Sequence, residues 1–96
     1  MGTDSEMTYS VLMAVYGKEN PEFLRQSIES MLNQTLPFSD FVLVCDGPLS
    51  HELNEVITWA QKQMGEKLQL IRLKENKGLG NALHVGVPRC RCSVIA

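Results

Sequence analysis

The sequence predicts a single α/β domain in which a doubly wound parallel β-sheet is covered by helices on both faces. Short, nearly continuous apolar runs alternate with segments whose apolar residues recur at helical spacing. The runs end at turn-forming residues. The chain has 96 residues and 44% hydrophobic content, which allows one compact core. Strands buried on both faces have this continuous pattern, because helices cover both sides of a parallel sheet.

The first strand and helix lie near the N-terminus. The apolar run 9–15 predicts the first strand, which we expect at the centre of the sheet. Asn20 is suited to cap a helix, and Pro21 is suited to its first position, where no N–H is needed. Apolar residues at helical spacing then predict a helix that ends near Asn33.

A second strand and helix follow. The apolar run 41–45 predicts a buried strand that ends at the turn sequence 46–48, Asp-Gly-Pro. Asp46 therefore stands at the C-terminal tip of this strand. Ser50 is suited to cap the next helix, whose apolar residues keep helical spacing up to Gly65.

The rest of the chain predicts a third strand, a third helix and the start of a fourth strand. The strand is expected over 68–73 and the helix over 79–86, with the turn 76–78 between them. Pro88 ends the helix, and the run 92–96 begins the fourth strand. Right-handed crossovers then give a Rossmann-like doubly wound parallel sheet.

The composition narrows the classes of partner that the chain could bind. Nine basic and eleven acidic residues give a net charge of −2, and no basic block favours nucleic acid or an anionic membrane as partner. No apolar run approaches the roughly 20 residues of a membrane span. The polar opening 1–6 does not resemble a signal peptide, and we expect it to be an expression remnant or a disordered N-terminus. We expect residues 7–96 to form the domain and the location to be cytoplasmic.

The cysteines do not predict a disulfide scaffold or a metal site. Their number is odd, and Cys45 lies within an apolar run, where a free buried thiol is common. Cys90 and Cys92 lack the spacing of a zinc knuckle and have no second pair.

Three polar features follow strand ends, where open α/β sheets bind ligands: the loop after the first strand, Asp46, and the turn 76–78. Asp46 could accept a hydrogen bond from a base imide or a ribose hydroxyl, or it could simply open the turn. Lys77, at the amino end of a helix, suits a phosphate, although an ordinary capping turn needs no ligand. Tyr16 could stack on a base or pack half-buried.

Four segments in order resemble the opening of family-two glycosyltransferases of the GT-A fold: 10–17, SVLMAVYG; 24–35, LRQSIESMLNQT; 41–47, FVLVCDG; and 76–83, NKGLGNAL. The resemblance covers about 9–96 and identifies the chain as the N-terminal, nucleotide-sugar-binding part of such a domain. It implies transfer of a sugar from a nucleotide diphosphate sugar, often a uridine diphosphate (UDP) sugar, to an acceptor glycan or glycoconjugate.

The resemblance also implies which residues bind the donor nucleotide. These are Ala14, Val15, Tyr16, Asp46, Asn76, Lys77 and Gly78. The residues of strand one match the loop that contacts the base. Asp46 matches the acceptor for the uracil imide or the ribose, and the turn 76–78 matches the turn beside the diphosphate. Cys45 replaces the first Asp of the usual Asp-Asp-Gly-Ser, and Pro48 stands where Ser is typical.

By the same resemblance, an Asp-x-Asp motif for manganese or magnesium and the acceptor-activating carboxylate would lie beyond Ala96. We therefore expect no catalytic or metal residue among these 96, and no transfer by this chain alone. The exposed edge of the fourth strand is expected to allow self-association. The alternatives are a nonenzymatic nucleotide-binding or protein-interaction α/β module, and a response-regulator-like domain. The latter needs paired acidic residues after strand one, where the chain offers only Glu19.

Overall fold

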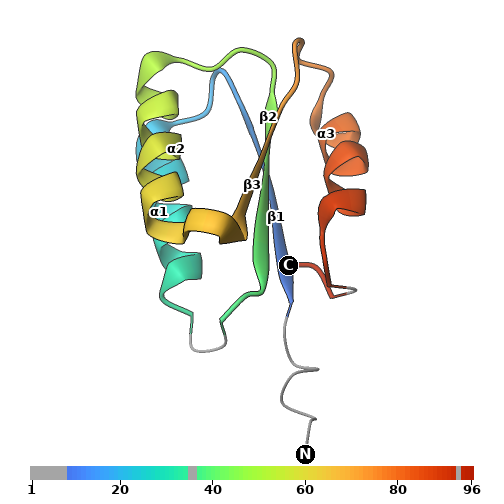
Figure 1. Cartoon of the computed structure of the whole chain (residues 1–96). Helices are drawn as coiled ribbons and strands as arrows, with labels where there is room; N and C mark the ends of the chain where they lie inside the picture. Colours follow the sequence, from blue (N-terminus) through green and yellow to red (C-terminus); the bar gives the residue numbers. More distant parts are fainter. Residues whose placement is uncertain (1–8, 35–36, 93) are drawn as a thin grey trace, which may run out of the picture.

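The computed structural model describes residues 9–34, 37–92 and 94–96, so the predicted N-terminal remnant 1–6 lies outside the described residues. Three strands alternate with three α-helices in the predicted order (Figure 1). The elements are β1 (Ser10–Tyr16), α1 (Pro21–Leu32), β2 (Asp40–Asp46), α2 (His51–Met64), β3 (Leu68–Arg72) and α3 (Leu79–Gly86). Short 3-10 turns follow α2 at Gly65–Lys67 and α3 at Val87–Arg89.

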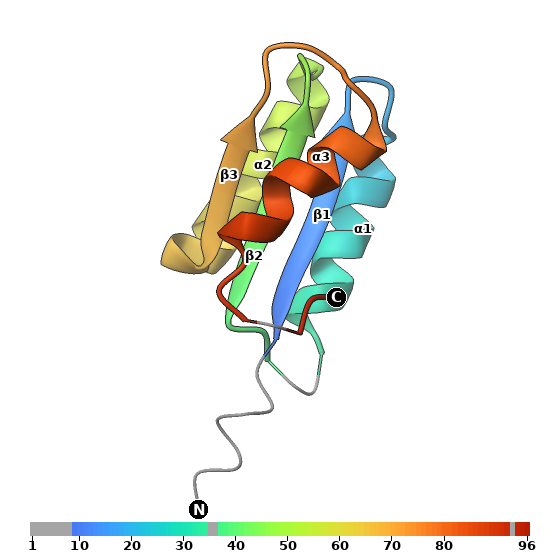
Figure 2. The ribbon, with the colours of Figure 1, turned by 90° about the vertical axis from the view of Figure 1, so that its right-hand side faces the viewer.

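The strands form one parallel sheet in the order β1-β2-β3 (Figure 2). Ser10 pairs with Asp40 and Tyr16 with Asp46, so β1 and β2 end at the same level. β2 is the middle one of these three strands, because it pairs on both sides; β1, which was predicted to be central, has its second neighbour in the C-terminal residues. All seven residues of β2 are buried, as its central position requires.

The C-terminal residues return to the outer edge of β1. The N–H of Ser10 donates to the oxygen of Val94 at 2.9 Å, and the N–H of Leu12 donates to the oxygen of Ala96 at 3.0 Å. Ile95 forms a parallel bridge with Ser10. The predicted fourth strand is thus present only as this short pairing over 94–96, beside β1. Self-association through that edge stays a prediction.

Helices cover both faces of the sheet, as predicted. In Figure 1, α1 and α2 lie on one side and α3 on the other. The main core lies between the sheet and the α1–α2 layer. On the opposite face, Ala82 of α3 packs with Val42 and Val44. Gly86 allows this helix to come close, because a Cβ built there would overlap the Cδ1 atom of Leu12.

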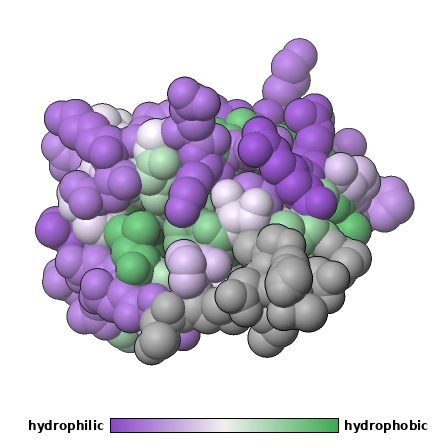
Figure 3. Space-filling model, turned by 60° about the horizontal axis from the view of Figure 1, so that its bottom comes forward, coloured by the Kyte–Doolittle hydropathy of each residue, from purple (hydrophilic) through white to green (hydrophobic). Residues whose placement is uncertain are grey.

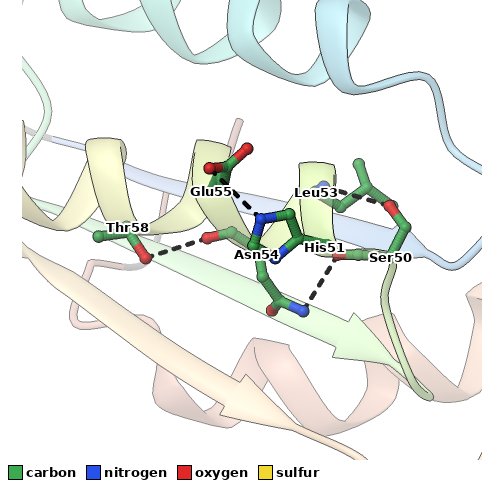
Figure 4. Close-up of polar contacts among 6 residues, drawn as sticks. All are labelled: Ser50, His51, Leu53, Asn54, Glu55 and Thr58. Atoms are coloured by element: carbon green, nitrogen blue, oxygen red, sulfur yellow. Dashed lines mark hydrogen bonds and ion pairs between the residues drawn. The ribbon is translucent and has the colours of Figure 1, made fainter.

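The predicted helix caps are present. At the start of α2, the Oγ of Ser50 accepts the N–H of Leu53 at 3.2 Å (Figure 4). The side-chain amide of Asn54 donates to the main-chain oxygen of Ser50 at 3.1 Å. His51 and Glu55 form an exposed pair one turn apart. These contacts fix the start of α2 and so the loop that follows β2.

A buried carboxylate organises the amino end of the sheet. Asp40 accepts hydrogen bonds from the Oγ of Ser10, from the main-chain N–H of Arg91 at 3.1 Å and from the Nε2 of Gln69 at 3.5 Å. The Oγ of Ser10 accepts the N–H of Cys92 at 2.9 Å. Both Asp40 and Ser10 are fully buried. This network directs the chain after α3 back to the edge of β1.

The lower end of the molecule, turned forward in Figure 3, is mostly hydrophilic, with hydrophobic residues in small groups. Within the described residues, no helix is both long and apolar enough to cross a membrane.

Candidate functional site

A cavity of about 490 Å³ opens at the carboxyl edge of the sheet, where the loops after β1, β2 and β3 meet at the top of Figure 1. Its volume is within the usual range of small-molecule sites. The cavity is lined by Ala14, Val15, Tyr16, Glu19, Asp46, Asn76, Gly78 and Leu79. The predicted site residues are therefore brought together, with the exception of the Lys77 side chain.

Strand alternation explains how the two strands contribute to this cavity. Successive side chains of a strand point to opposite faces of the sheet. Val44 packs on the α3 side, and Asp46, two residues later, shares that face. Ala14 also packs on the α3 side, so Tyr16 at the end of β1 shares the same face. The two strand tips therefore face the loop that leads into α3.

The Asp46 carboxylate bonds to the main chain of that loop. Its Oδ1 accepts the N–H of Lys77 and its Oδ2 accepts the N–H of Gly78, each at 2.9 Å. The residue is only 4% exposed. A carboxylate oxygen has two lone pairs, so each oxygen keeps one for a further donor.

Gly47 lets the end of β2 approach the turn closely. Its φ of +93° lies in the left-handed region, which favours glycine. A Cβ built on Gly47 would lie 2.7 Å from the main-chain nitrogen of Asn76. No other residue type fits here without moving the turn.

The amino end of α3 forms one wall of the cavity. Gly78 is the N-cap, with φ +96°, and no side chain caps the helix. Its N–H also lies 3.1 Å from the Oδ1 of Asn76. Uncapped amides at a helix N-terminus carry partial positive charge and suit an anion.

Lys77 takes part through its main chain. Its side chain lines a neighbouring hollow with residues that include Lys74 and Glu75. The structure also adds two residues to the predicted set: Glu19 in the loop after β1, and Leu79, the first residue of α3. Leu79 belongs to the segment 76–83, NKGLGNAL, which carries part of the family resemblance. The sequence therefore already contained a signal for this residue.

Cys45, which stands beside Asp46, faces away from the cavity. Its side chain belongs to the core under α1 and α2, so it has no part in the cavity wall. Burial raises the pKa of this thiol, although the nearby Arg72 guanidinium lowers it in part. Cys45 therefore remains a neutral core residue. Cys45, Cys90 and Cys92 form no disulfide bond.

The described residues do not fit a divalent metal ion. Within 9–34, 37–92 and 94–96, no group of three or more His, Cys, Asp or Glu side chains is placed to share one. The manganese or magnesium ion expected through a motif beyond Ala96 stays a prediction.

A doubly wound parallel sheet with a cavity at its carboxyl edge is the arrangement in which open α/β proteins bind ligands. Comparison with known proteins then fixes the family. The chain belongs to glycosyl transferase family 2, whose sequence profile matches residues 10–96. The fold is that of the N-terminal, Rossmann-like half of such a domain.

Similar proteins include other glycosyltransferases. The chain is 45% identical over 89 residues to the amylovoran biosynthesis glycosyltransferase AmsE of Erwinia amylovora, an alignment that covers 92% of this chain and 32% of the relative. It is 33% identical over 88 residues to the UDP-Gal:alpha-D-GlcNAc-diphosphoundecaprenol beta-1,3-galactosyltransferase of Escherichia coli, which covers 92% and 31%. The chain thus spans about a third of the length of these curated relatives.

Proposed function

We propose that this protein transfers a sugar from a UDP sugar to an acceptor hydroxyl in polysaccharide or glycoconjugate synthesis, and that the cavity at the carboxyl edge binds the donor nucleotide. One observation carries the proposal: a single cavity combines carboxylate acceptors with the uncapped amino end of a helix.

These two kinds of group suit the two ends of a nucleoside diphosphate. The uracil imide and the ribose hydroxyls are hydrogen-bond donors, and the carboxylates of Glu19 and Asp46 are acceptors. Carboxylates repel a diphosphate, whereas the first amides of α3 attract one. The nucleoside therefore lies toward the tips of β1 and β2, and the diphosphate lies toward Leu79 at the start of α3.

The names of the relatives support the donor and the product class. One is a galactosyltransferase whose name gives UDP-Gal as its donor, and another is assigned to amylovoran biosynthesis. Transfer needs acceptor deprotonation and charge stabilisation of the leaving diphosphate. The described residues contribute nucleotide binding to this reaction. We expect the 96-residue chain to bind UDP without transferring sugar. The cytoplasmic location stays a prediction.

Replacing Tyr16 with alanine is expected to weaken UDP binding about tenfold, because a base stacked on an aromatic ring gains about 1–3 kcal/mol. Tyr16 lines the cavity and is 44% exposed, so its ring is accessible to a base. Tyr16→Phe keeps the ring and is the matched control, with affinity close to that of the unchanged protein. Calorimetric titration with UDP measures all three.

The same titration tests the proposed donor. CDP has an acceptor nitrogen where UDP has an imide N–H, so carboxylate acceptors should favour UDP. Equal affinity for UDP and CDP would contradict recognition of the imide. A protein that binds neither nucleotide would overturn the assignment of this cavity and favour a protein-interaction role for the module.

A further inference from the structure

An exposed apolar flank runs along α3 and the 3-10 turn that continues it. Leu79, Leu83 and Val87 stand four positions apart, so they lie on one side of the helix. These residues are 64%, 36% and 47% exposed, although all three are large and apolar. Ala82 and Gly86, which face the sheet, are buried. The apolar surface of α3 is therefore wider than the part that the sheet covers.

This apolar flank is turned toward β1 and away from β3. Leu79 lines the cavity together with residues of β1 that include Tyr16. Asn81 lines a different hollow, together with Leu73, which follows β3. At about 3.6 residues per turn, Leu79 and Leu83 lie nearly opposite Asn81 on the helix. The flank therefore lies toward the outer edge of β1, beside which the C-terminal residues pair (Figure 2).

The C-terminal residues add another exposed apolar side chain on the same face of the sheet. Ile95 bridges Ser10, and paired residues of neighbouring parallel strands point to the same face. Ser10 shares its face with Leu12, which packs on the α3 side. Ile95 is 37% exposed there. The pairing described on this edge reaches Leu12, so the remainder of β1 can accept a longer strand.

We propose that the apolar flank of α3, together with Ile95, is the surface on which the protein packs the residues that follow Ala96. The chain spans about a third of the length of its curated relatives, so a protein of their length has many more residues to place. A strand that continues along β1 brings the next residues beside the flank. Contiguous exposed apolar residues mark interaction surfaces. This inference goes beyond donor binding, because it concerns how the rest of the protein is attached.

Leu83→Asp tests the proposal in the 96-residue chain and in a longer protein that includes the residues after Ala96. Leu83 lies at the surface of the 96-residue chain, so its Tm should change by about 2 °C or less. In the longer protein the new carboxylate is buried among apolar side chains, and we expect the Tm to fall by about 8 °C. His84→Asp is the matched control, because it places the same charge on an exposed neighbour outside the flank.

Hydroxyl-radical footprinting gives a second test that needs no substitution, and it decides the question if Leu83→Asp does not fold in the longer protein. Mass spectrometry then measures the oxidation of Leu79, Leu83 and Val87. We expect these residues to be oxidised in the 96-residue chain and protected several-fold in the longer protein. Protection in the 96-residue chain that increases with protein concentration, or that requires anionic lipid vesicles, would assign the flank to a second copy or to a lipid surface and overturn the proposal.

The remaining outcomes separate this proposal from the proposed function. Equal oxidation of the flank in both proteins, or an equal effect of Leu83→Asp in both, would overturn the packing surface, as would a coding sequence that ends at Ala96. Leu83 does not line the cavity, so Leu83→Asp should leave the UDP affinity of the 96-residue chain unchanged. Failure of the unchanged chain to bind UDP would remove the donor site and leave the packing surface standing.

Discussion

Replacing Asp40 with alanine is expected to lower the free energy of unfolding by about 3 kcal/mol, because three buried or half-buried donors lose their acceptor. These donors are the hydroxyl of Ser10, the N–H of Arg91 and the side-chain amide of Gln69. Gln69 keeps its bond to the main-chain oxygen of Arg89, so the loss falls mainly on Ser10 and Arg91. Urea unfolding followed by Trp59 fluorescence measures the change.

Glu55→Ala is the control for this variant. Glu55 is an exposed carboxylate whose partner is His51 on the same helix, and its removal should change stability by about 0.5 kcal/mol or less. The double variant with Ser10→Ala should cost less than the sum of the single changes, since the two residues share one bond. A loss below about 1 kcal/mol for Asp40→Ala would mean that desolvation of the carboxylate offsets its hydrogen bonds.

Replacing Phe41 with alanine is expected to have the larger effect, a loss of about 4 kcal/mol in the free energy of unfolding. The side chain is fully buried on β2, and its ring meets the edge of the Phe38 ring with centroids 5.6 Å apart. The cost combines the lost apolar burial with the cavity left in the core. A domain of this size has about 5–15 kcal/mol of total stability, so a large share is removed.

Phe23→Ala makes the same chemical change at a different place. Phe23 is on α1 and is 61% exposed, so its loss should alter stability by about 0.5 kcal/mol or less. Similar destabilisation by both variants would contradict the burial of Phe41. Thermal unfolding gives a second measure, in which the Phe41 variant should show a much lower Tm than the Phe23 variant.

The sequence predicted the elements well because local patterns determine them. A continuous apolar run is visible in β2 without knowledge of its neighbours, and the caps at Asn20 and Ser50 act within a single helical turn. The order of the strands in the sheet could not be predicted in this way, because β1 and β2 have the same kind of apolar pattern. Which of them is central depends on pairings between distant parts of the chain, and no local feature records those.

Part of the candidate site could likewise be predicted from the sequence, and part of it could not. The topology rule brought Tyr16, Asp46 and the turn 76–78 to one edge, and the cavity confirms that placement. The rule could not show that both oxygens of Asp46 accept main-chain amides. Asp40 was missed altogether, because it precedes its apolar run and reads as a polar residue outside the strand.

The two carboxylates of β2 also bear on the order in which the molecule assembles. The main-chain amides that donate to Asp46 lie 31 and 32 residues later in the chain. The Arg91 amide that donates to Asp40 lies 51 residues later. Synthesis begins at the N-terminus, so β2 is made well before the groups that satisfy its ends. A growing chain that has not reached residue 78 has strands to pair but no completed pocket. Nucleotide binding at the proposed site therefore requires a chain that extends at least to Leu79, at the start of α3.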